Sequence, residues 1–313
     1  MRAGMHVLAL SRQYEVHVLV LARFGIEPDL MPEPELSAKM MSFNIVEVPL
    51  RQPSLNNSTP SNLDVLVRLF TRPRFVSNFS PPQVSAILGL LGDKKFDLIL
   101  FGRLSTSMLW ENADFRKWAG HTPRILDMDD IESVTAMREA KATGLKKGRI
   151  GHLNDLLDAV KLDLIERRQF KKFDAVLLCS SSDQAKMTRR HPKAVFGVMP
   201  NGFRVPAMPQ ERSEPDILTL LFVGFLQYLP NTDGIQFFCD KVLPQIRQRL
   251  DRPFRLLVVG RKPPQSVKDL ERIPEVTVVG EVPQVEPYYQ SATMAIVPIC
   301  QNGAADPFEI TFV

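Results

Sequence analysis

Three glycines in the second half of the chain each end a short apolar run. Gly224 ends "LLFVG", Gly260 ends "LLVVG" and Gly280 ends "VTVVG". Because glycine lacks a side chain, the backbone N–H groups of such loops and the N-terminus of a following helix can approach phosphate oxygens closely. We therefore expect the three glycines to line one rim that binds a nucleotide. The simpler alternative is that each glycine only makes a tight turn between a strand and a helix.

Carboxylates follow an apolar run in the first half of the chain. The segment "RILDMDDIES" places Asp129, Asp130 and Glu132 at the end of a short apolar stretch. Paired carboxylates can bind a metal ion or act as acid and base. An Asp before a helix can instead cap it, and we expect Asp130 to cap a helix that begins near Ile131. Asp129 and Glu132 are therefore the candidate catalytic residues.

The elements that position these residues alternate between strands and helices. In the second half the pattern predicts strands at 217–223, 254–260, 276–280 and 294–299, separated by helices at 232–250, 265–272 and 284–292. In the first half it predicts helices at 3–12, 62–71, 81–92 and 151–172, and strands at 14–21, 43–48, 96–101, 123–130 and 173–180. Ser182 and Asp183 are expected to cap the helix after the last of these strands. Short strands separated by helices indicate parallel sheets with right-handed crossovers.

A Pro-rich polar stretch, "MPNGFRVPAMPQERSEPD", divides the two patterns and is typical of a linker. We expect an N-terminal domain at 1–200, a linker at 201–216 and a C-terminal domain at 217–313. The predicted fold class is α/β, with two Rossmann-like, doubly wound parallel-sheet domains.

Composition limits the function classes. Lys and Arg number 39 against 35 Asp and Glu, and this mild net charge of +4 does not indicate a nucleic-acid binder. Three cysteines without a CxxC pair suggest neither a disulfide framework nor a zinc site, which favours a reducing compartment. No apolar run approaches the roughly 20 residues that cross a bilayer, and the N-terminus does not resemble a signal peptide. The sequence contains no GxGxxG and no GxxxxGK[ST] motif.

Basic residues gather in three places: Lys146-Lys147-Gly148-Arg149, Arg167-Arg168 with Lys171-Lys172, and Arg189-Arg190. Such runs are usually solvated helix faces. The alternative is a surface that meets anionic lipid or phosphate.

The ordered set of motifs resembles the retaining glycosyltransferases of family four, which have the GT-B fold. "LLFVGFLQYLPNTDGIQFFCDKVLPQI", "LLVVGRKPP" and "VTVVGEVPQVEPYYQSATMAIVPI" follow one another in the family's order, after the hinge motif "VMPNGF". "RILDMDDIES" and "FDAVLLCSSSDQAKM" are similar to two later strand segments of the family's N-terminal domain. The resemblance covers almost the whole chain and is strongest from 195 to 299.

The resemblance also implies roles for individual residues. Three are implied to line the sugar-diphosphate pocket: Gly224, Tyr228 and Asn231. Two are implied to lie near the nucleotide: Gly260 and Arg261. Three are implied to border the base: Gly280, Glu281 and Val282. Arg261 alone among them carries a cationic fork suited to phosphate. The histidine that is common in the family near the position of Asp129 is absent here.

Two departures from the family pattern concern the ends of the chain. Family members begin with a strand and a Gly-rich loop ahead of the helix at 3–12, and they continue after the last strand with a segment that holds the donor's sugar and ribose. We therefore expect a truncated chain in which both domains can be incomplete. Such a chain is expected to be impaired or inactive as a catalyst. The strands near 16–21 and 96–101 would then each expose an unpaired edge.

The function that the resemblance implies is transfer of a sugar from a nucleotide-diphosphate sugar to a glycan or lipid-linked acceptor, in polysaccharide biosynthesis. The nucleotide sugar is a co-substrate, and no cofactor or metal is expected. We expect a cytoplasmic protein with peripheral contact to the inner membrane face and no nucleic-acid partner. Two other readings stay open at this point: a non-catalytic chain that binds a nucleotide or a partner, and a sugar-nucleotide epimerase.

Overall fold

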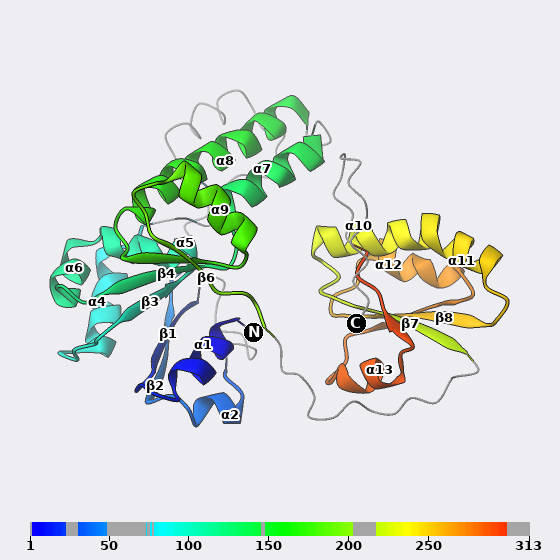
Figure 1. Cartoon of the computed structure of the whole chain (residues 1–313), viewed down its shortest axis with the longest axis horizontal. Helices are drawn as coiled ribbons and strands as arrows, with labels where there is room; N and C mark the ends of the chain where they lie inside the picture. The colour runs from blue at the N-terminus through cyan, green and yellow to red at the C-terminus, as the bar shows by residue number, and fades with distance from the viewer. Residues whose placement is uncertain are drawn as a thin grey trace. The chain divides into compact units, whose positions relative to one another are not determined.

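The structure is a computed structural model that describes most of the chain. The described residues are 2–22, 31–48, 73, 76, 78–144, 148–202 and 217–298. The chain divides into two compact units, Met1–Arg204 and Val205–Val313 (Figure 1). This division falls inside the predicted linker, most of which lies outside the described residues, as does the helix predicted at 62–71.

The second unit contains one four-stranded parallel sheet with the order β10-β7-β8-β9. Its strands are β7 (Leu218–Val223), β8 (Phe254–Val259), β9 (Val276–Gly280) and β10 (Met294–Ala295). The chain adds β8 and β9 on one side of β7 and then returns to add β10 on the other side. The predicted α/β class with parallel sheets is therefore confirmed.

Both faces of this sheet are covered. Alternate side chains of the central strands enter two separate apolar cores, because successive residues of a strand point to opposite faces. Leu220 and Phe222 belong to the larger core, whereas Leu221 belongs to the smaller one. Helices lie on both sides of the sheet (Figure 1): α10 (Leu229–Phe237), α11 (Leu243–Arg249), α12 (Gln265–Lys268) and α13 (Glu286–Ser291). The unit is thus doubly wound.

The prediction of one helix at 232–250 is wrong in two respects. The observed helix α10 begins earlier, at Leu229, and a π-helical turn at Phe238–Val242 separates α10 from α11. Pro244 follows this turn at the start of α11. Because proline has no N–H to donate to the preceding turn, a regular helix cannot continue through it.

The first unit contains two parallel sheets. One pairs β1 (His17–Ala22) with β2 (Ser42–Glu47). The other has the order β3-β4-β5-β6, with β3 (Ile99–Gly102), β4 (Arg124–Met128), β5 (Ala175–Leu178) and β6 (Phe196–Val198). Within the described residues, β1 pairs only with β2 and β3 only with β4, so each of these two strands has one edge without a strand partner.

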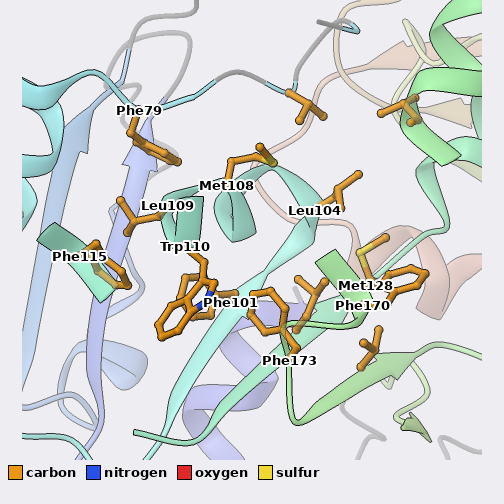
Figure 2. Close-up of a cluster of buried hydrophobic side chains, with 14 of the residues drawn as sticks. Phe79, Phe101, Leu104, Met108, Leu109, Trp110, Phe115, Met128, Phe170 and Phe173 are labelled. Carbon is orange, nitrogen blue, oxygen red and sulfur yellow. The ribbon is translucent and has the colours of Figure 1, made fainter. Parts of the chain in front are cut away.

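Several aromatic side chains pack within the core of this unit (Figure 2). Phe101 packs edge to face against Phe173, with ring centroids 5.2 Å apart, and it also contacts Phe115. Trp110 is buried and carries the guanidinium of Arg124 over its ring at 4.3 Å. The segment between β3 and β4, for which the sequence predicted no element, supplies much of this core through α5 (Arg103–Ser107), the 3-10 helix Met108–Glu111 and α6 (Ala113–Ala119).

Helices surround the two sheets of the first unit: α1 (Arg2–Leu10), α2 (Pro34–Ser37), α4 (Pro81–Leu91), α7 (Glu132–Thr143), α8 (Gly148–Phe170) and α9 (Ser181–Arg190). The expected cap of α7 by Asp130 is wrong. The residue at the cap position is Ile131, and the Asp130 carboxylate accepts a hydrogen bond from the Thr135 hydroxyl at 2.8 Å. The backbone N–H of Ser133 instead donates to Glu166, which reaches it from α8.

The cap of α9 also differs from the expectation. The Ser180 hydroxyl accepts a hydrogen bond from the Asp183 backbone N–H at 3.1 Å, so Ser180 takes the cap position and Ser182 lies inside the helix.

We expect Ser180→Ala to lower the free energy of unfolding of the first unit by about 1 kcal/mol, because the Asp183 N–H loses its acceptor. Ser182→Ala is the matched control, and it should change stability by less than about 0.5 kcal/mol. Urea unfolding followed by tryptophan fluorescence measures both variants, since the two tryptophans of the chain, Trp110 and Trp118, lie in this unit. Equal losses in the two variants would show that the cap assignment is incorrect.

Candidate functional site

The three glycines lie at one edge of the second unit's sheet. They end or follow β7, β8 and β9, which are neighbours, and their backbones are joined across the strands. Gly224 N–H donates to the carbonyl of Val259 at 3.0 Å, and Gly260 N–H donates to the carbonyl of Gly280 at 2.7 Å. The expectation of a shared glycine rim at the carboxyl ends of neighbouring strands is thus confirmed, whereas its ligand remains a prediction.

Two of these glycines have a packing reason as well. A Cβ atom built on Gly260 would lie 1.8 Å from the carbonyl oxygen of Gly224, which is a backbone atom. A Cβ on Gly224 would lie 2.9 Å from the side-chain nitrogen of Asn231. The loops after β7 and β8 therefore approach each other at a distance that only glycine permits.

The loop after β7 is held by its own polar side chains. Asn231 donates its side-chain N–H to the carbonyl of Phe225 at 3.0 Å, and the Thr232 hydroxyl donates to the carbonyl of Leu226 at 2.7 Å. Tyr228 stands at the cap position of α10 with about half of its side chain exposed, and no side chain caps this helix end. The N-terminal end of α10, where the helix dipole is positive, therefore carries no capping side chain.

Arg261 follows the second glycine of the rim. Its guanidinium carbon lies 5.1 Å from the ring centroid of Phe225, which belongs to the neighbouring loop and is 40% exposed. Its backbone carbonyl accepts a hydrogen bond from the N–H of Leu226 at 3.2 Å. The cationic group is thereby positioned over the loop that follows β7, beside the rim.

Besides Gly280, the two other residues implied to border the base occupy different surroundings. Glu281 is exposed after Gly280. Val282 is partly buried and packs against the smaller apolar core. Ligands of open parallel sheets bind where the strand order reverses, which in this sheet is between β7 and β10. Of the two loops that flank this point, the one after β7 carries Tyr228 and Asn231.

The first unit brings four polar side chains together at the carboxyl ends of its strands. Arg103 follows β3, Asp129 follows β4, Cys179 follows β5 and Asn201 follows β6. The Asp129 carboxylate accepts a hydrogen bond from Arg103 at 3.1 Å through one oxygen and from Asn201 at 3.2 Å through the other. The Cys179 thiol donates to the backbone carbonyl of Asp129 at 2.6 Å. We call these four residues the Asp129 cluster.

Glu132, the second candidate catalytic residue, is the first residue of α7. Its negative charge acts on the carboxylate of Glu166, a side chain that is almost completely buried. Burial raises the pKa of Glu166 to about 7, the two hydrogen bonds from Ser133 oppose this shift, and the charges of Glu132 and Asp163 add to it. The structure thus gives Glu132 a neighbour that the sequence did not reveal.

Sequence reasoning missed three residues in and around the four-stranded sheet of the first unit: His6, Arg103 and Asp127. Asp127 is buried on β4 and lies 3.4 Å from the Nε2 atom of His6, which α1 contributes. A histidine therefore does lie near this strand, although it comes from a distant part of the sequence. Arg103 could have been found, because it directly follows Gly102 at the end of an apolar run.

Among the described residues, no group of three or more His, Cys, Asp or Glu side chains gathers in a way that could hold a metal ion. None of the helices described is both long enough and apolar enough to span a membrane.

Comparison with solved structures gives similarities at low identity. Medicago truncatula UGT71G1 complexed with UDP-glucose is 12% identical, with 94% of this chain and 72% of that chain covered at a TM-score of 0.48. A UDP-glucosyltransferase from Polygonum tinctorium capable of glucosylating indoxyl, in a complex with 3,4-dichloroaniline, is also 12% identical, with 87% and 73% covered at a TM-score of 0.40.

Comparison of the sequence itself is informative for the second unit. None of the curated proteins compared with the chain matches it. Residues 218–311 match the family model described as "Glycosyl transferases group 1". These residues include all four strands of the second sheet, the glycine rim and Arg261. This part of the chain is therefore similar to the glycosyl transferases of group 1.

Proposed function

We propose that the chain transfers a sugar from a nucleotide-diphosphate sugar to a glycan or lipid-linked acceptor, as a retaining glycosyltransferase of the family-four type. The observation that carries the proposal is the glycine rim on three neighbouring parallel strands, with Arg261 beside it, inside the segment that matches the glycosyl transferase family model. A diphosphate is the anion that such a rim suits, because the glycines carry no side chains that would keep its oxygens from the N-terminal end of α10 and the guanidinium of Arg261.

The chemistry that we assign to this rim is electrostatic. When the bond between the sugar and the diphosphate breaks, negative charge develops on the leaving diphosphate. The guanidinium of Arg261 and the N-terminal end of α10 stabilise that charge without forming a covalent bond. In this proposal Asn231 positions the loop, while Tyr228 contacts the donor with its exposed ring.

We further propose that the chain acts in the cytoplasm at the inner membrane face, in polysaccharide biosynthesis. One face of α8 supports membrane contact. Leu153, Val160 and Leu164 are each 45% to 60% exposed, and their spacing of seven and four residues places them on one face of the helix. Arg149 and Arg167 lie on the same face, one turn beyond each end of this apolar stripe. Co-sedimentation with vesicles that contain anionic lipid tests the proposal, which predicts binding that weakens as salt is added.

Arg261→Gln tests the donor site. We expect this change to weaken binding of UDP- or GDP-sugars by about 10- to 100-fold, because a hydrogen bond to a charged group contributes about 1.5 to 3 kcal/mol. Isothermal titration calorimetry with a panel of nucleotide sugars measures the loss. Arg249→Gln, an exposed arginine of the same unit, is the matched control and should bind as the parent does.

Product analysis after incubation of the chain with the same nucleotide sugars and a membrane extract separates the alternatives. Sugar transfer to a membrane extract supports the proposed activity. Binding without turnover would indicate a non-catalytic nucleotide-binding protein, and conversion of the free nucleotide sugar to its epimer would indicate an epimerase. Unchanged binding in Arg261→Gln would show that the rim is not the donor site.

A further inference from the structure

Arg103 has an unusual backbone for its residue type. Its φ is 72°, in the left-handed region, and the only other non-glycine residue with a positive φ among the described residues is Lys262. Both are cations close to the end of a parallel strand. The left-handed region is strained for a residue with a Cβ atom, and such strain concentrates at functional sites.

The neighbours of Arg103 fix the direction of its side chain. Asp129 accepts one hydrogen bond from the guanidinium and is itself held by Asn201 through its other oxygen. The Thr106 hydroxyl donates to the Arg103 carbonyl at 3.1 Å, which ties the strained residue to the first turn of α5. The carboxylate therefore orients the arginine, and Asp129 acts as a positioning residue rather than as a free base.

The guanidinium keeps donors for a ligand. An arginine has five N–H donors, and the bond to Asp129 uses one of them. The Arg103 side chain is 63% exposed, whereas the Asp129 side chain is 30% exposed, so the cation is the more accessible member of the pair. The remaining fork can bind two oxygens of one anion in parallel.

The place of the pair in the fold also favours a ligand. Arg103 and Asp129 follow β3 and β4, two neighbouring parallel strands, and the carboxyl edge of such a sheet is where α/β proteins bind ligands. We propose that Arg103, oriented by Asp129 and Asn201, binds a phosphate or diphosphate group of the acceptor. This inference rests on the proposed function, and it narrows the acceptor to a molecule that carries a phosphate or diphosphate group.

The test uses inorganic pyrophosphate and an alkyl phosphate as probes. Both are titrated into the full chain that carries Arg261→Gln, so that the donor rim contributes little. Adding Arg103→Gln is expected to weaken binding of both probes at least 10-fold. Adding Arg12→Gln, which changes an exposed arginine of the same unit outside the basic clusters, leaves binding unchanged. Absence of probe binding before Arg103 is changed, or a change of less than twofold afterwards, would overturn the inference.

Arg103→Gly separates a binding role from a structural one. Glycine adopts a φ of 72° without strain, so the Tm should stay within about 2 °C of the parent or rise, although probe binding is lost as in Arg103→Gln. A fall of more than about 4 °C would assign Arg103 to stability instead. Titration of UDP-sugar into the single variant Arg103→Gln separates the two sources of phosphate. Retained UDP-sugar binding supports a role of Arg103 in binding the acceptor. Lost UDP-sugar binding would show that Arg103 binds the phosphates of the donor instead.

Discussion

Gly260→Ala is expected to lower the free energy of unfolding of the second unit by about 3 kcal/mol or more. The new Cβ atom would lie 1.8 Å from the carbonyl oxygen of Gly224, so the loops after β7 and β8 must move apart. Neither atom is the end of a flexible side chain, and the backbone itself has to shift. Because Gly260 N–H also bonds to the carbonyl of Gly280, the displacement reaches the third strand.

Hydrogen–deuterium exchange measures this loss within the second unit, which contains no tryptophan. The protected amides of β7 and β8 should exchange about 100-fold faster in the variant. Nucleotide-sugar binding should fall as well, since the displaced loops carry Arg261 and Asn231. Protection within threefold of the parent would show that the two loops do not make this close contact.

Two matched glycine-to-alanine changes give a scale for the effect. At Gly280 nothing lies within 4 Å of an added Cβ, but φ is 80°, so the cost should be only the strain of about 1 to 2 kcal/mol. Gly89 lies in α4 with open space around it, and alanine there should stabilise the helix by about 0.5 to 1 kcal/mol. The same chemical change is thus expected to have three different effects.

The second sheet could be predicted from the sequence because its information is local. Each strand is a short apolar run bounded by a glycine or a polar turn, and the helices between the strands are long enough for crossovers. Neighbouring strands of this sheet are mostly consecutive in the sequence. The break in the helix after β7 was also encoded locally, by Pro244, but the apolar spacing on both sides of this residue favoured one continuous helix.

The first unit was less predictable because its polar contacts join distant parts of the sequence. Arg103 and Asp129 are 26 residues apart, and Asn201 is 72 residues from Asp129. A local rule selected Asp130 as the cap of α7, yet the acceptor is Glu166, 33 residues from Ser133. Local patterns identify a carboxylate at a strand end, but not the residue that it orients.

Glu166 is expected to make the first unit less stable as the pH rises. Burial raises its pKa in the folded chain to about 7 from an ordinary value of 4.5. Between these two values the folded state binds more protons than the unfolded state, so the free energy of unfolding falls with increasing pH. The contribution is fully present below about pH 4.5, and about 3 kcal/mol of it is lost by pH 8.

Glu166→Gln tests this dependence. An amide is similar in shape to a protonated carboxyl group, and its oxygen can still accept the hydrogen bond from the Ser133 N–H. The variant should match the parent near pH 5 and exceed it by about 3 kcal/mol at pH 8. Urea unfolding followed by tryptophan fluorescence reports on this unit, because Trp110 is part of its core.

Two further variants separate charge from hydrogen bonding. Glu166→Ala leaves the Ser133 N–H buried without this acceptor, and it should therefore destabilise the unit at both pH values. Glu111 is a carboxylate of the same unit whose pKa is lowered: burial raises it, but hydrogen bonds from Lys172 and Gln169 and the positive charges of Lys172 and Arg168 outweigh the burial. Glu111→Gln should thus give no gain in stability at pH 8. If Glu166→Gln is no more stable than the parent at pH 8, then Glu166 is ionised at little cost, and water or the Ser133 bonds must compensate for its burial.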